Sequence, residues 1–211
     1  VKAIGMPLAR RVLQDYPGLR LSLTESLSGT TLLHLQSVDV DMALVYNPPA
    51  TPILDRTPLL EERMVLIGRP DIIGTSPDPI TADEVLDLPI ILLRQGVSAR
   101  ALMEDTGLLK KLEARARLQM NSVQAIGDAL VAGLGCAIGT DLFMHERLQS
   151  GELISRPIIA PVLHRTLYLC QLTTRPPTVA REVIHDLIVQ LVLEAVASGA
   201  WPARVLYEPP R

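Results

Sequence analysis

The chain has 211 residues, with 20 basic and 23 acidic side chains and a formal net charge of -3 at pH 7. Nucleic-acid-binding domains usually carry a basic excess or a basic stripe, so this charge balance argues against a chain whose main function is to bind nucleic-acid phosphates. Only 3% of the residues are aromatic while 48% are hydrophobic, which excludes a base-stacking platform and indicates an aliphatic core. A chain of this length forms one or two domains and buries a sizeable core without disulfides or metals.

Strand-like and helix-like patterns alternate along the chain, as in β-α-β units. In the first part, strands are predicted at 19–24, 42–46 and 62–68, and a helix at 28–36. The apolar run at 64–67 is continuous, which favours a strand that is covered on both faces. The segment 70–79 carries glycine, serine and proline, so it is the best candidate for a linker.

A second series of elements follows. Helices are predicted at 81–86, 98–106, 122–132, 141–148 and 178–196, and strands at 89–93, 112–120, 136–138 and 166–172. Thr81 and Glu84 have the spacing of a capping box, and Thr178 is the expected N-cap of the last helix. The apolar face of that helix is wide, which favours burial on two sides or a contact with another subunit.

The sequence shows no sign of export or of a metal centre. Residues 1–5 lack the pattern of a secretion signal, and no apolar stretch approaches the roughly 20 residues that span a bilayer. We therefore expect a soluble, cytoplasmic protein without a membrane partner, whose N-terminal portion precedes Val1. Cys136 and Cys170 lie inside apolar runs, which favours two buried reduced thiols over the alternative of an oxidised pair. The four histidines are scattered, so we expect no metal and no cofactor.

Several short motifs follow one another in order over nearly the whole chain. They are Tyr-Pro-Gly at 16–18, Val-Asp-Met-Ala-Leu at 40–44, Pro-Leu-Leu-Glu-Glu at 58–62, Leu-Pro-Ile-Ile-Leu at 88–92, Ala-Gly-Leu-Gly at 132–135 and Gly-Glu-Leu at 151–153. As an ordered set they resemble the effector-binding domain of LysR-type transcriptional regulators. The residues at 44–49 are most similar to the nitrogen-assimilation-control-like branch of that family.

The resemblance implies an α/β, two-lobed, periplasmic-binding-protein-like fold with two crossover strands. Lobe I would comprise about 1–68 and 173–211, and lobe II about 69–172. A small polar or anionic metabolite would bind between the lobes, and the domains would pair into dimers and tetramers. DNA would be contacted only through a winged helix-turn-helix that belongs ahead of Val1. In one departure, the family carries a longer loop and helix between the positions of Gly5 and Tyr16.

Six polar residues are the candidates for contacts with this effector: Ser28, Arg94, Gln95, Ser98, Asn121 and Thr140. Ser28 begins a helix, whose free N–H groups and dipole favour an anion, and an ordinary N-cap is the alternative. Arg94, Gln95 and Ser98 follow the strand at 89–93 and lead into a helix, and Arg94 or Arg100 could hold a carboxylate in a bidentate pair. A solvated loop charge is the alternative there.

Asn121 precedes a helix, where a cap is the favoured role, and Thr140 follows the strand at 136–138 in place of a proline that is common in the family. The segment 133–139 superficially resembles a dinucleotide fingerprint, but its spacing is off by one, so a tight helix-to-strand turn is favoured. Glu61 and Glu62 are expected at an exposed strand end rather than as an acid–base pair.

Three hypotheses about function remain. The regulatory domain of a LysR-type transcription factor is the favoured one. A solute-binding protein of a transporter, with the same two-lobed shape, is the alternative. An enzyme is the least favoured, because no nucleophile, base or cofactor anchor stands out.

Overall fold

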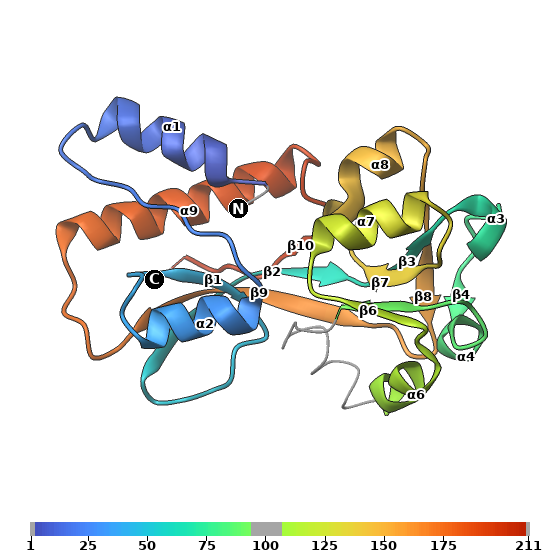
Figure 1. The fold of residues 1–211 in the computed structure, drawn as a ribbon. Helices are drawn as coiled ribbons and strands as arrows, with labels where there is room; N and C mark the ends of the chain where they lie inside the picture. Colours follow the sequence, from blue (N-terminus) through green and yellow to red (C-terminus); the bar gives the residue numbers. More distant parts are fainter. Residues whose placement is uncertain (1–2, 94–106, 210–211) are drawn as a thin grey trace. The chain divides into compact units, whose positions relative to one another are not determined.

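The computed structural model describes residues 3–93 and 107–209, and the chain divides into two compact units. Unit 1 comprises Val1–Glu61 and Thr166–Arg211, and unit 2 comprises Glu62–Arg165. Two strands, β2 (Leu54–Arg63) and β9 (His164–Leu172), run from one unit into the other. The chain therefore passes between the units twice, once in each direction (Figure 1).

The boundaries of the two units lie inside these strands, earlier than the positions near 68 and 172 that the sequence suggested. The reason is strand pairing. Strand β3 (Val65–Gly68) pairs with strands of unit 2, so the residues after Glu61 belong there. The part of β9 from Leu167 to Cys170 pairs with β1 (Ala43–Tyr46), so it belongs to unit 1.

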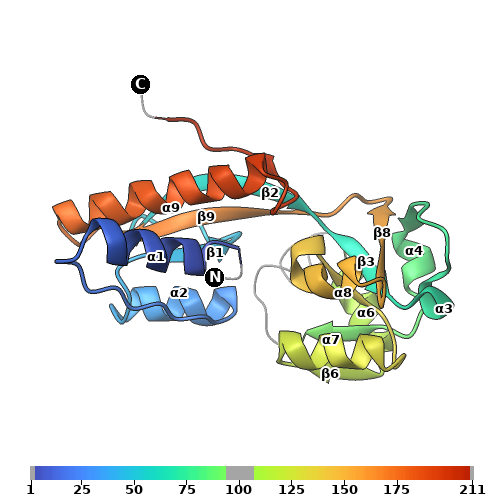
Figure 2. The same cartoon turned by 90° about the horizontal axis from the view of Figure 1, so that it is seen from above.

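Unit 1 is built on a four-stranded sheet in the order β1-β9-β2-β10, where β10 is Arg204–Val205. Helix α2 (Ser28–Gln36) packs against β1, and α1 (Gly5–Asp15) lies beside the long helix α9 (Val179–Ala197) (Figures 1 and 2). One apolar cluster joins α2 to the sheet, and its buried members are Leu35, Ala43, Val45, Leu54, Cys170 and Leu172.

Helix α9 begins where the sequence predicted it, because the Thr178 hydroxyl accepts a hydrogen bond from the Arg181 N–H at 3.3 Å. Its buried side chains lie in the second half of the helix, from Leu187 to Val192. Helix α1 occupies the stretch before Tyr16, where the resemblance implied a longer loop and helix, and it buries Leu8 and Val12.

Unit 2 contains two hydrogen-bonded groups of strands, β4-β8-β3-β7 and β5-β6. Their bounds are β4 Ile80–Thr81, β5 Ile91–Leu93, β6 Leu118–Met120, β7 Ala137–Gly139 and β8 Ile154–Ile159. A parallel bridge between Ile90 and Cys136 joins the two groups. Strands β5 and β6 are also parallel, whereas β3 is antiparallel to both β7 and β8. Strands β6, β5 and β7 are therefore neighbours that run in one direction.

Helices cover both faces of this sheet. Their bounds are α3 Pro70–Ile73, α4 Ala82–Val85, α6 Leu108–Arg115, α7 Val123–Val131, the 3-10 turn η1 Asp141–Met144 and α8 His145–Gln149. Along the run 64–67, Met64 and Leu66 belong to one apolar cluster, and Val65 and Ile67 belong to the other. The prediction that the run 64–67 is covered on both faces is confirmed.

Two strand predictions were wrong. Residues 19–24 form no strand and are mostly exposed, because their apolar side chains find no ladder partner in the described part of the chain. The run 112–120 is helical in its first half. Leu108, Leu109 and Leu112 bury one face of α6, and only the last three residues form β6.

The proposed linker at 70–79 is part of unit 2 rather than a connection between units. Its first residues form α3, and Ile73 is buried in the core of that unit. The predicted helix at 98–106 lies outside the described residues. Gly107 is the N-cap of α6 with a left-handed φ of 68°. No helix in the parts that the structure describes is long and apolar enough to cross a membrane.

Candidate functional site

Three neighbouring strands of unit 2 end at one edge of its sheet. Because β6, β5 and β7 are parallel, their carboxyl ends, at Met120, Leu93 and Gly139, lie at the same edge. Ligands of open α/β sheets bind at such carboxyl edges. The sequence candidates Asn121 and Thr140 directly follow two of these strands. Arg94, Gln95 and Ser98 follow the third in sequence, but they lie outside the described residues.

Asn121 is exposed, and the cap of the following helix is its neighbour, Ser122. The Ser122 hydroxyl accepts a hydrogen bond from the Ala125 N–H at 3.3 Å, so it satisfies one of the free N–H groups at the start of α7. The Asn121 side chain is therefore not used as the cap. It stands at the N-terminus of α7, where the helix dipole favours an anion.

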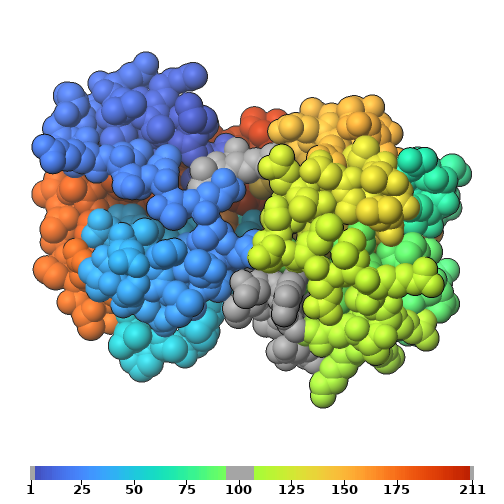
Figure 3. Space-filling view, viewed as in Figure 1, coloured from blue at the N-terminus to red at the C-terminus, as the bar shows by residue number. Residues whose placement is uncertain are grey.

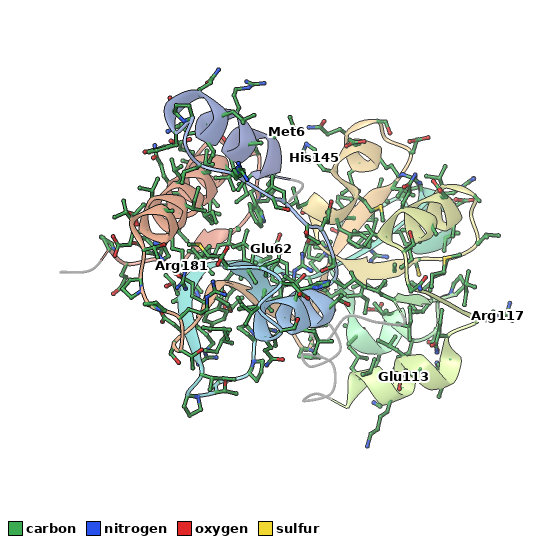
Figure 4. All side chains as sticks on the ribbon, turned by 60° about the vertical axis from the view of Figure 1, so that its left-hand side comes forward. Met6, Glu62, Glu113, Arg117, His145 and Arg181 are labelled. Carbon is green, nitrogen blue, oxygen red and sulfur yellow. The ribbon has the colours of Figure 1, made fainter. Side chains whose placement is uncertain are left out.

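Thr140 belongs to a buried polar cluster with Glu62 and Arg165, neither of which was a candidate for effector contact. The Arg165 guanidinium donates from Nε to Glu62 Oε2 at 2.7 Å and from Nη2 to the Thr140 hydroxyl at 3.0 Å. Glu62 is 1% exposed, Thr140 is 2% exposed, and the Arg165 side chain is 15% exposed. Glu62 lies on β2 and is labelled in Figure 4.

The cluster lies at the same edge as the carboxyl end of β7. Val65, at the start of β3, pairs with Gly139, at the end of β7, so the residues just before β3 reach this edge. Glu62 and Arg165 belong to the two crossover strands at the ends that lie in unit 2. The ion pair thus links both crossover strands to the strand end that carries Thr140. The expectation of an exposed strand end is wrong for Glu62.

In unit 1, Ser28 lies at a comparable edge. It is the first residue of α2, and its hydroxyl accepts a hydrogen bond from the Tyr46 N–H at 3.2 Å, at the carboxyl end of β1. The preceding Ser26 shares a hydrogen bond of 2.7 Å with Thr31 on the first turn of α2. Hydroxyl groups and the helix N-terminus therefore gather at one end of β1.

The same edge of unit 1 receives the second crossover strand. The Thr166 N–H donates to the Asn47 Oδ1 at 2.8 Å, and the Asn47 N–H donates to the Thr166 carbonyl at 2.9 Å. Thr166 is the first residue of β9 in unit 1, and it directly follows Arg165 of unit 2. In each unit, the candidate hydroxyls are thus grouped around the point where the chain enters or leaves.

Other chemistries find no support in the described residues. Burial raises the pKa of the Cys136 thiol to about 12 and that of the Cys170 thiol to about 12, so neither is a thiolate near neutral pH. Both cysteines are free and buried, as the sequence predicted. Within 3–93 and 107–209, no group of three or more His, Cys, Asp or Glu could hold a metal ion.

The glycine-rich segment 133–139 is a helix-to-strand turn, as predicted. Gly133 follows α7 with a left-handed φ of 74°, and Gly135 passes close to the backbone of Pro89, just before β5. A Cβ at Gly135 would lie 2.2 Å from the Pro89 carbonyl oxygen. The glycines therefore serve the close approach of two backbones, not a phosphate.

The chain has two α/β units joined by two crossover strands, and each unit has hydroxyls and a helix N-terminus at its crossover edge. These features define the class as a periplasmic-binding-protein-like α/β domain. The model of the family described as "LysR substrate binding domain" matches residues 2–192. The chain therefore belongs to the LysR substrate-binding domain family.

Curated relatives of the chain are transcriptional regulators. The HTH-type transcriptional regulator BbuR of Bordetella bronchiseptica is 26% identical over 197 residues, which cover 92% of this chain and 59% of BbuR. The nitrogen assimilation regulatory protein nac of Klebsiella aerogenes is 31% identical over 137 residues, which cover 64% of this chain and 44% of nac. The chain spans only about half of the length of these relatives. Since the relatives are regulators, the alternative hypothesis of a solute-binding protein of a transporter is not favoured.

Solved structures share the fold. A mutant of OxyR from Corynebacterium glutamicum has a TM-score of 0.74 and 20% identity, and the match covers 94% of this chain and 63% of the OxyR chain. The regulatory domain of CcmR from Synechocystis, in complex with 2-PG, matches 90% of this chain and 89% of that chain, with a TM-score of 0.67 and 24% identity. At these identities the similarity establishes the architecture alone.

Proposed function

We propose that this chain is the effector-sensing domain of a LysR-type transcription factor, and that it has no catalytic role. The family membership supports the sensing role, and its curated relatives are regulators. The full-length protein would contact DNA through a helix-turn-helix domain, in the cytoplasm, and the domain described here would report effector binding to it. A ligand acts in this way only through different affinities for two arrangements of the protein.

The grouping of polar side chains at the crossover edges carries the proposal. The grouping contains Ser28 in unit 1, and Asn121 and the Thr140–Arg165–Glu62 cluster in unit 2. A ligand at these edges would bind to groups that lie close to the crossover strands. An effector held there would act directly on the two strands that connect the units. Arg94, Gln95 and Ser98 remain candidates for further contacts with it.

The chemistry of these edges favours a small anion. Each edge carries the N-terminus of a nine-residue helix, α2 or α7, whose free N–H groups and dipole attract negative charge. Hydroxyl and amide side chains add hydrogen-bond donors. We therefore propose that the effector is a small polar metabolite with a carboxylate or phosphate group.

Calorimetric titration tests the proposal. The purified chain would be titrated with small carboxylates and phosphates, including 2-PG, the compound in the Synechocystis CcmR structure. We expect at least one compound to bind, and Ser28→Ala or Asn121→Ala to weaken its affinity by about tenfold through the loss of one hydrogen bond to a charged group. Ser198→Ala, which removes an exposed hydroxyl at the end of α9, is the control and should leave the affinity unchanged.

A cellular experiment completes the test. Deleting this domain from the full-length regulator should abolish the response of its promoter to the compound that binds. The sensing proposal would be wrong if no metabolite in the cell stabilised the domain and if the promoter responded normally after the deletion.

A further inference from the structure

Asp141 carries a buried oxygen without a partner at the edge of unit 2 where the candidate contacts are grouped. It is the first residue of η1 and directly follows Thr140, just after the carboxyl end of β7. Its Oδ1 atom is buried and has no hydrogen-bond partner among the described residues. The residue as a whole is only partly buried, so it lies near the surface of unit 2 and not deep in its core.

An unpaired buried oxygen calls for a donor. Buried polar atoms of folded proteins are nearly always hydrogen-bonded, and an ionised carboxylate can only accept hydrogen bonds. The guanidinium of the neighbouring polar cluster is directed elsewhere, because Arg165 donates to Glu62 at 2.7 Å and to Thr140 at 3.0 Å. Within that cluster the charges of Arg165 and Glu62 balance each other. The negative charge of Asp141 therefore suits a positively charged donor from outside the fold.

The same edge also has a place for a negative group. Asn121 stands before α7, a nine-residue helix whose free N–H groups and dipole favour an anion. Asn121 follows β6 and Asp141 lies just beyond β7, and β5 runs between these two strands. Since neighbouring strands are about 4.8 Å apart, the two strand ends are separated by about 10 Å. A molecule of several bonds, with a cation at one end and an anion at the other, fits this arrangement.

We propose that Asp141 determines the specificity of the effector site, by binding the ammonium group of an amino-acid effector. An ammonium group is favoured over a hydroxyl, because hydrogen bonds between ionised groups are roughly twice as strong as those between neutral groups. A carboxylate of the same molecule is held at the N-terminus of α7. The inference rests on the proposed sensing function, and it names the class of compound that the site takes.

Matched pairs of compounds test this assignment. The purified chain would be screened by thermal shift against the twenty common amino acids. Each amino acid that binds would then be compared, by calorimetric titration, with the carboxylic acid that lacks only the α-amino group, such as glutamate with glutarate. We expect at least one amino acid to bind, and to bind at least about tenfold more tightly than its partner compound. Asp141→Asn should abolish this preference and leave the affinity for the partner compound unchanged.

A measurement without ligand separates this role from a structural one. Because Asp141 Oδ1 has no donor in the folded chain, Asp141→Asn should not lower the midpoint of thermal unfolding in the absence of added compounds. Asp87→Asn is the matched control. It changes an exposed carboxylate of the same unit, which accepts a hydrogen bond from Arg115 Nη1 at 2.8 Å, and it should leave the preference for the amino acid unchanged.

Four results would overturn the role of Asp141. They are the failure of all twenty amino acids to bind, equal affinities within the matched pairs, an unchanged preference in Asp141→Asn, and a lower unfolding midpoint of that variant without ligand. Effector sensing itself would survive them if a compound without an ammonium group, such as 2-PG, bound the chain and Asn121→Ala weakened that binding. The two proposals can therefore fail separately.

Discussion

At the scale of single residues, the pairing of Arg165 with Glu62 is the most consequential contact of unit 2. A carboxylate that is 1% exposed is tolerated because a guanidinium donates to it at 2.7 Å. Removing one partner of such a pair costs more than removing both, since the remaining charge loses its compensation. The two members lie on different crossover strands, so the contact also fixes how these strands pass each other within unit 2.

Arg165→Ala should therefore destabilise the protein by about 3 kcal/mol. The double variant Glu62→Leu with Arg165→Met should recover most of that loss, because neither charge remains buried. Urea unfolding at neutral pH measures both. Arg175→Ala, at an exposed ion pair, should cost less than about 1 kcal/mol. A double variant as unstable as Arg165→Ala would show that the loss comes from packing and not from the broken ion pair.

The two buried thiols give a prediction with a defined pH range. Burial raises the pKa of Cys136 and of Cys170 from 9.0 to about 12. A raised pKa means that the folded state holds the proton more tightly, so this contribution to stability is present below pH 9 and is lost as the pH rises toward 12. Both thiols should resist labelling by a disulfide reagent at pH 8 and react fully in denaturant. Rapid labelling of the folded protein would contradict their burial.

At the scale of elements, the meeting of β5 with β7 depends on a glycine. A methyl group at Gly135 would lie 2.2 Å from the Pro89 carbonyl oxygen, which itself accepts the Cys136 N–H at 3.0 Å. The bridge that unites the strands of unit 2 is formed at this point. The position of the edge that carries Asn121 and Thr140 therefore depends on the lack of a side chain at Gly135.

Gly135→Ala should destabilise the protein by more than about 2 kcal/mol, because backbone atoms on both sides must shift. Gly18→Ala is the matched control, since a Cβ there meets no atom within 4 Å. It should change the stability by less than about 0.5 kcal/mol. Thermal unfolding of the two variants measures the difference, and equal stabilities would contradict the close approach.

Elements with strong local signals could be predicted from the sequence, whereas those that depend on distant partners could not. Helix α2 and the caps at Thr81 and Thr178 follow from residues within one turn of each other. Residues 19–24 have a strand-like composition but lack a ladder partner. Helix α6 was mistaken for a strand, although the spacing of Leu108, Leu109 and Leu112 indicated one apolar face.

The candidate site shows the same division. Ser28, Asn121 and Thr140 could be chosen because each follows or begins a recognisable element. Glu62 and Arg165 could not be paired from the sequence, since 103 positions separate them and only the two crossover strands bring them together. One signal was available for Glu62. It alternates with Leu60 and Met64, which are both buried, so the period of the strand places it inside.

At the scale of the whole molecule, we propose the surface of α1 as a contact between copies of this chain. Met6 and Leu13 are 73% and 72% exposed, and seven residues on a helix return to the same side. Figure 3 shows α1, in dark blue, at the surface of unit 1, and Figure 4 labels Met6 on that helix. Scattered apolar side chains are ordinary on a surface, but a pair on one helical face suits a contact between subunits.

Met6→Glu with Leu13→Glu should therefore weaken self-association by at least about tenfold, because burying two carboxylates in an apolar contact is costly. Sedimentation velocity over a range of concentrations measures it. Val162→Glu, at an exposed apolar position of unit 2, is the control and should leave the association unchanged. Self-association that is unaltered in the double variant would contradict a contact through α1.

The division of unit 1 into two segments sets the order in which the protein can be completed during synthesis. Unit 2 is one continuous stretch, Glu62–Arg165, so all of it has been made before the second half of unit 1 leaves the ribosome. Among the strands of the described residues, β1 pairs with β9 alone, so it must wait for β9. Since domains fold as units while the chain grows, unit 2 should fold first. Helix α9 and β10 then complete unit 1 after unit 2, which contains one end of β2 and one end of β9, has folded.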